Sequence, residues 1–181
     1  MSVQPGDTPK GMVRCDLSGD ISNFIAKERS TDPSTAKSAS DQWSQAKKNG
    51  AVAEYVAIYS DSSSHCETFK QAGTDPTTAT YKLIINFVFQ YKDEKSAVNA
   101  YTTGPIFDTS VANLRSGNSQ AIEGTKTGLS ANSIVISQPV SNQTFYIALW
   151  QKKTFAILLI ALNLDPADSK KIATAENNRI K

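Results

Sequence analysis

The sequence predicts one α+β domain, built on a mostly antiparallel, twisted sheet of about five or six strands that helices cover. The first observation is segment 144–164, TFYIALWQKKTFAILLIALNL, in which two long apolar strands flank a short polar turn. The second is Tyr81–Tyr91, YKLIINFVFQY, in which apolar side chains alternate along a strand. The third is an alanine-rich helical segment after each of these strands, beginning at Asp93 and at Asp165.

The N-terminal residues differ in composition from the rest of the chain. Residues 1–14, MSVQPGDTPKGMVR, contain two prolines and two glycines and few apolar side chains. We therefore predict a flexible lead over residues 1–14 and a single α+β domain over residues 15–181.

Two helices are predicted at the start of that domain. Leu17 is followed by three apolar residues at helical spacing, and Ser18 or Asp20 is the candidate cap of this first helix. The second helix begins at Asp32-Pro33, since Asp accepts free N–H groups and Pro fits the first turn. It ends at Asn49-Gly50, where Gly permits a left-handed conformation.

The residue pattern of the predicted strands indicates which of their faces are buried. Ala51–Ser60 and Tyr81–Tyr91 both carry apolar residues at alternating positions. In the second strand the other face mixes apolar residues with Lys82, Asn86 and Gln90, which indicates a face that is only partly covered.

The charge distribution and the length of the apolar runs exclude two classes of protein, those that bind nucleic acid and those that span a membrane. The 19 basic and 17 acidic residues are scattered along the chain, so we predict no nucleic-acid partner. The longest apolar run, Phe155–Leu162, is far shorter than the roughly 20 residues of a membrane span. The N-terminus lacks the apolar stretch of a signal peptide, and we hypothesise that Met1 replaces a signal that was removed.

The two cysteines, Cys15 and Cys66, are candidates for a disulfide. Such a bond would close a loop of about 50 residues and stabilise the fold by about 4 kcal/mol. The composition favours an extracytoplasmic location, whether periplasmic, cell-surface or secreted. The alternative is a cytoplasmic protein with two buried free thiols.

No reactive cluster stands out. His65 and Cys66 are neighbours in sequence, and in a strand the side chains of neighbours point to opposite faces, so the two residues would rarely form a working dyad. The glycines at 117, 124 and 128 are too widely spaced for a phosphate loop. We predict no catalytic residue, no cofactor and no metal site, so the protein is expected not to be an enzyme. An enzyme that uses Cys66 is the alternative, which a thiol-reactivity assay would test.

The tip of the C-terminal hairpin is the candidate contact with a partner. Trp150 precedes the polar residues Gln151, Lys152 and Lys153, and an aromatic ring beside cationic groups suits a partner or an anionic surface. The alternative is a solvated hairpin turn.

The C-terminal half resembles the PsbP-like superfamily of small exported bacterial domains, which are often lipoproteins. The residues that carry the likeness run from Gly124 through Leu129 and Asn132, and are followed by FYIALWQK, TFAILLIALN and a closing helix over Lys170–Lys181. The match covers about residues 50–181 and departs at the hairpin tip, where many relatives have an Arg-x-Gly-Asn-like turn. The resemblance implies an α/β/α sandwich and a non-catalytic accessory role.

Together these observations predict an exported accessory protein that binds a protein partner, at a membrane surface or in a larger complex. The alternative is a small-molecule or lipid carrier, with an apolar pocket between sheet and helices lined by residues such as Phe87, Tyr55 and Trp150.

Overall fold

The computed structural model describes residues 1–75, 78–104, 106, 109–117, 120–140 and 143–181. Within them, eight strands form one antiparallel sheet in the order β1-β3-β4-β8-β7-β6-β5, and β2 also pairs with β3. The strands are β1 (Val13–Arg14), β2 (Gly19–Asp20), β3 (Ala51–Ser60), β4 (Leu83–Tyr91), β5 (Ile122–Glu123), β6 (Asn132–Val140), β7 (Gln143–Lys152) and β8 (Phe155–Leu162). The helices are α1 (Ile21–Thr31), α2 (Pro33–Lys48), α3 (Ser63–Phe69), α4 (Glu94–Thr103), α5 (Val111–Ser116) and α6 (Pro166–Arg179), with short 3-10 turns η1 (Pro5–Asp7) and η3 (Gly124–Thr127).

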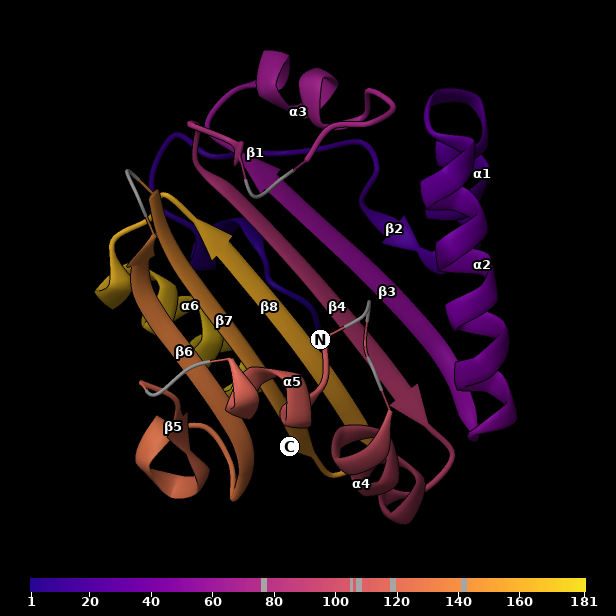
Figure 1. The fold of residues 1–181 in the computed structure, drawn as a ribbon, viewed down its shortest axis with the longest axis vertical. Helices are drawn as coiled ribbons and strands as arrows, with labels where there is room; N and C mark the ends of the chain where they lie inside the picture. Colours follow the sequence, from indigo (N-terminus) through magenta and orange to yellow (C-terminus); the bar gives the residue numbers. More distant parts are fainter. Residues whose placement is uncertain (76–77, 105, 107–108, 118–119, 141–142) are drawn as a thin grey trace.

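Both faces of the sheet are covered, which confirms the predicted α+β class. Helices α1, α2, α4 and α5 pack on one face, here called the front face, while α6 and the N-terminal segment lie behind the sheet (Figure 1). Five of the strands have eight or more residues and carry the core, whereas β1, β2 and β5 have two residues each.

The alternation in β4 places its side chains as the sequence predicts. Leu83, Ile85, Phe87 and Phe89 belong to the front layer, and Ile84 and Val88 to the rear layer. The rear face is partly covered, because Asn86 is buried there while Gln90 is exposed. The uncovered end of this face is where a candidate site lies.

The predicted helix starts are confirmed by their caps. The side chains of Asp20, Asp32, Asp93 and Asp165 each accept a hydrogen bond from a backbone N–H in the first turn of their helix. The first helix begins at Ile21 rather than near Leu17, because residues 19–20 pair with β3 as strand β2.

The N-terminal segment differs from the expected flexible lead. Val3 is 1% exposed, its N–H donates to Asn86 Oδ1 at 3.0 Å, and its carbonyl accepts from the Tyr59 hydroxyl at 3.1 Å. Arg179 holds Asp7 through two hydrogen bonds of 2.8 and 2.7 Å. Residues 1–8, here called the strap, are therefore packed on the rear face of the domain, because partners distant in sequence satisfy their polar groups.

Candidate functional site

The two cysteines are joined. Cys15 follows β1, Cys66 lies on α3, and their sulfur atoms form a disulfide with a Cα–Cα distance of 5.3 Å. The predicted pairing is thus confirmed in the structure. His65 and Cys66 lie on a helix rather than on a strand, because Ser62 caps α3 by accepting from the His65 N–H.

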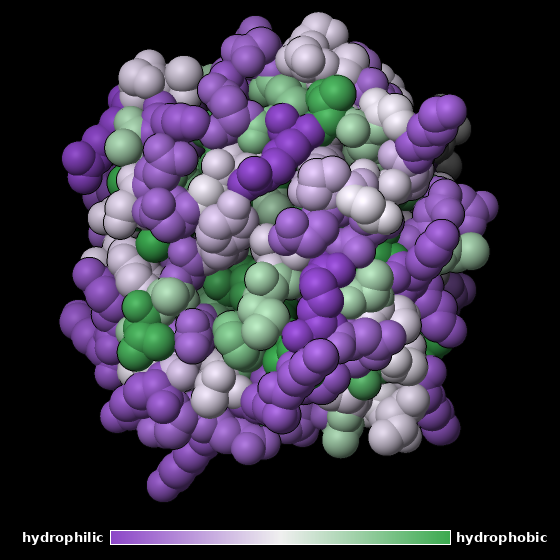
Figure 2. Space-filling model, turned by 180° about the vertical axis from the view of Figure 1, so that it is seen from behind, coloured by the Kyte–Doolittle hydropathy of each residue, from purple (hydrophilic) through white to green (hydrophobic). Residues whose placement is uncertain are grey.

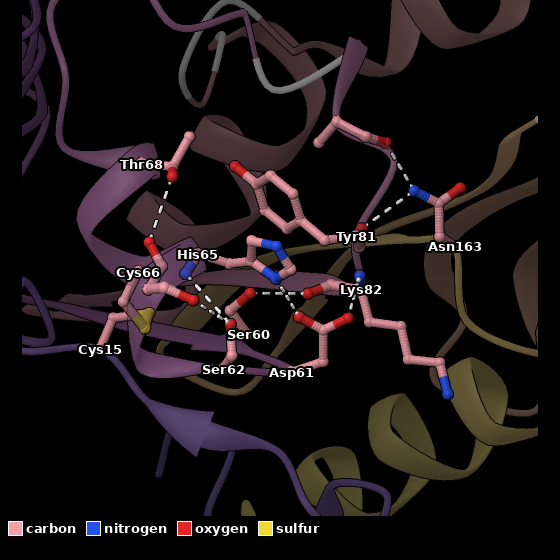
Figure 3. A network of polar contacts seen from close by, with 12 residues as sticks. Cys15, Ser60, Asp61, Ser62, His65, Cys66, Thr68, Tyr81, Lys82 and Asn163 are labelled. Atoms are coloured by element: carbon pink, nitrogen blue, oxygen red, sulfur yellow. Dashed lines mark hydrogen bonds and ion pairs between the residues drawn. A yellow bond between two sulfur atoms is a disulfide. The ribbon is translucent and has the colours of Figure 1, made fainter.

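An acid–base pair lies beside this disulfide. Asp61 and His65 are four residues apart at the start of α3, and the His65 Nδ1 contacts an Asp61 carboxylate oxygen (Figure 3). The second oxygen of Asp61 accepts from the Lys82 N–H at 3.1 Å. Burial raises the pKa of Asp61, but the hydrogen bonds from His65 and Lys82 outweigh it, so this pKa lies below its ordinary value.

The surroundings of this pair favour a structural role. The His65 ring stacks on Tyr81 with a centroid distance of 4.4 Å (Figure 3). Among the described residues, no hydroxyl or thiol side chain forms a hydrogen bond with the imidazole ring of His65, and Cys66 is held in the disulfide. The pair fastens α3 to the end of β3. Asp61 and His65 are four positions apart in the sequence, the spacing of neighbours on one face of a helix. This spacing would have predicted their contact if a helix capped by Ser62 had been recognised.

The turn of the C-terminal hairpin lies two residues further along the chain than predicted, and this changes which of the predicted contact residues are exposed. Strand β7 continues through Lys152, and the turn lies at Lys153 and Thr154. Trp150 is therefore fully buried beneath α6 in the rear layer. Gln151 is buried too, where it accepts from Asn132 at 2.8 Å. Neither side chain can reach a partner.

The two lysines at the tip behave differently. Lys152 Nζ donates to the carbonyl oxygen of Asn177 at 2.7 Å, near the C-terminus of α6, where a cation is favourable. Lys153 is exposed in the turn. Lys153 alone remains available as the predicted contact.

The main candidate site is a groove on the rear face, here called the rear groove. It has a volume of about 540 Å³. Its base is formed by Tyr55, Val88 and Phe155, and the strap with Met1, Ser2 and Gln4 lines one side. Figure 2 shows apolar side chains gathered in a hollow near the middle of this face.

The polar groups of the rear groove lie at its rim. Gln90 and Asp20 line it, and Asp20 is engaged as the cap of α1. The Arg14 guanidinium lies 5.9 Å from the centre of the Tyr55 ring and donates to its hydroxyl. The lining of the groove thus combines apolar and polar side chains, as interaction surfaces do.

Two glutamates are buried in the domain, one of which, Glu54, is among the residues that line the groove. Glu54 sits between Ala53 and Tyr55, but its side chain faces the front layer with Phe89, and neither carboxylate oxygen has a partner. Burial raises the pKa of Glu54 to about 8. On the rear side, burial likewise raises the pKa of Glu176 to about 8, although Asn86 donates to it at 3.0 Å.

No arrangement for a metal ion or a membrane span is found in the described part of the chain. No group of three or more His, Cys, Asp or Glu side chains there could hold an ion. No helix there is both long enough and apolar enough to cross a bilayer.

Comparison with known proteins yields little. No protein-family model matches the chain, and no curated protein matches it. The crystal structure of the extracellular domain of PknH from Mycobacterium tuberculosis aligns with 99% of this chain and 86% of its own, at 10% identity and a TM-score of 0.40. A TM-score this low carries no argument. The PsbP-like resemblance therefore stays a prediction.

Proposed function

We propose that this chain is an exported, non-catalytic accessory domain that binds a protein partner through the rear groove. The disulfide between Cys15 and Cys66 supports an extracytoplasmic location, because such bonds persist in oxidising compartments. Its formation also removes the thiol that the alternative enzyme would need. A periplasmic, cell-surface or secreted site, and attachment to a larger complex or a membrane surface, belong to the same proposal.

The observation that carries the proposal is the open groove on the rear face, which has an exposed apolar side chain at its side. Met1 lines the groove and is 53% exposed. It is one of three large apolar residues that are exposed in the described chain. Apolar groups left in water on a small domain mark an interaction surface.

The arrangement of the sheet argues against the carrier that the sequence suggested as the alternative. The pocket expected for a carrier is not formed by the expected residues. Phe87 packs in the front layer and Trp150 in the rear layer, so the sheet itself separates them.

Site-specific photo-crosslinking tests the proposal. Ala53, exposed in the groove, is replaced by p-benzoylphenylalanine in the full chain, and the protein is irradiated with cell-envelope extract of the source organism. We expect one discrete adduct with a polypeptide. The control is the same replacement at Ala112, which is exposed on α5 at the front face.

Two results would contradict the proposal. The first is the absence of a polypeptide adduct at Ala53, and the second is equal adduct formation at Ala53 and Ala112. The compartment is checked separately by alkylating the native protein without reductant. Two reactive thiols in protein from its source would contradict export.

A further inference from the structure

A second groove on the rear face differs in charge from the first. It lies between the first turn of α6 and the β5–η3–β6 edge of the sheet, and its volume is about 240 Å³. Ile122, Val135 and Tyr146 give it an apolar base. Ile122 pairs directly with Val135, so both side chains lie on the same face of the sheet.

Two lysines form the rim of this smaller groove. Lys126 and Lys170 line it and are exposed, and among the described residues neither forms an ion pair. Lys170 Cε lies 3.8 Å from the position of a Cβ on Gly128, so its side chain reaches the turn that carries Lys126. Two ammonium groups from separate elements thus border one apolar surface.

The neighbouring carboxylates do not neutralise this rim. No carboxylate lines the groove in the described part of the chain. Asp165 accepts from the Ala167 N–H at 2.8 Å as the cap of α6. Asp168 is two positions before Lys170, a spacing that places the two side chains on different sides of a helix.

We propose that this groove binds a single-chain amphiphile with a carboxylate head. The chain lies on Ile122, Val135 and Tyr146, and the head group lies between Lys126 and Lys170. A methylene-sized group occupies roughly the 30 Å³ of a water molecule, so the groove accommodates a chain of about eight carbons. Ile122 is 48% exposed and would lose that exposure beneath the bound chain.

The same features argue against a bilayer as the occupant. Stable attachment to a membrane takes two strong signals, such as two acyl chains or one chain and a polybasic patch. Two lysines beside one exposed isoleucine fall short of that. The inference is independent of the protein-binding proposal, since it concerns a different groove.

Titration of the full-length protein with sodium octanoate, followed by amide NMR shifts, tests the inference. We expect shifts confined to the smaller groove, at residues such as Ile122, Val135 and Lys170. The Lys126→Gln, Lys170→Gln double variant should bind octanoate at least tenfold more weakly. Lys171→Gln is the matched control on α6 and should bind as the wild type does. Octyl glucoside, which has a neutral head, should bind at least tenfold more weakly than octanoate.

Several outcomes would overturn the inference. They are equal octanoate affinity in the double variant and the wild type, equal affinity for octyl glucoside, or shifts that map to the rear groove at Tyr55 and Phe155. Binding to anionic phosphatidylglycerol vesicles without binding to octanoate would assign the lysines to a membrane surface instead. Apart from shifts in the rear groove, none of these outcomes bears on crosslinking at Ala53, so the two proposals can fail separately.

Discussion

The two faces of the sheet differ in which elements cover them and in which contacts hold those elements in place. On the front face, four helices cover the strands, and the disulfide from Cys15 to Cys66 ties the N-terminal part of the chain to α3. On the rear face, one helix and the strap cover only part of the sheet, and polar contacts such as the Arg179–Asp7 pair hold the strap. The two grooves described above lie on the rear face, because a single helix is too narrow to cover five long strands.

The largest effect is expected at the front face. Replacing both cysteines by alanine, Cys15→Ala with Cys66→Ala, should lower the free energy of unfolding by about 4 kcal/mol, because the unfolded chain regains the entropy of a closed loop. The two residues are 51 positions apart. Urea denaturation of the oxidised wild type and the double variant measures this. A change below about 1 kcal/mol would mean that apolar packing alone closes the front face.

The second effect is a pH dependence set by Glu54. Burial raises the pKa of Glu54 from its ordinary value of 4.5 to about 8. The folded state holds the proton more tightly than the unfolded state does. The contribution of Glu54 to the free energy of unfolding is therefore most favourable below pH 4.5 and becomes less favourable as the pH rises toward 8. Glu54→Leu should lose this part of the slope and be about 3 kcal/mol more stable than the wild type at pH 8.

Denaturation curves at several pH values check the effect of Glu54. Glu123→Gln is the control, because the hydrogen bond from Arg115 lowers the pKa of Glu123. The stabilisation from the Arg115–Glu123 pair is lost only as the pH falls through the lowered pKa of Glu123. Glu123→Gln should therefore leave the slope of the free energy of unfolding between pH 6 and pH 8 unchanged. An identical slope in Glu54→Leu and the wild type would show that Glu54 is solvated in the folded protein.

The third effect concerns the rear face. Arg179→Ala removes both hydrogen bonds to Asp7 and the bond of 3.0 Å to the carbonyl oxygen of Ser2. We expect a loss of about 2 kcal/mol and faster amide exchange in the strap, because charge-assisted hydrogen bonds hold it. A double-mutant cycle with Asp7→Ala isolates the pair. Zero coupling would indicate that apolar contacts such as Val3 fasten the strap.

The smallest effect is expected at the hairpin tip. Lys152→Ala removes the hydrogen bond to Asn177 near the C-terminus of α6 and should lower the free energy of unfolding by about 1 kcal/mol. Lys153→Ala is the adjacent control and should stay within about 0.5 kcal/mol of the wild type. Thermal or urea unfolding distinguishes them. Equal losses of unfolding free energy in Lys152→Ala and Lys153→Ala would contradict a stabilising role for the Lys152 contact with the C-terminal end of α6.

The regular elements were predictable because their signals are local. Asp32-Pro33, Asp93 and Asp165 mark helix starts, since a cap depends on the next three residues only. The hairpin tip was misplaced by two residues, and that small error decided whether Trp150 and Gln151 were exposed or buried. Side-chain exposure is sensitive to register in this way because strand residues alternate between faces.

The sequence by itself determined the α+β class and the long strands and offered the two cysteines as a candidate pair, because periodicity, caps and residue counts are properties of the chain. Only the tertiary structure decided that the strap is packed, that Lys126 and Lys170 border one groove, and that Glu54 is buried without a partner. These features depend on elements that are far apart in the sequence and meet across the sheet. No local sequence pattern encodes which part of a sheet face a helix covers and which part stays open.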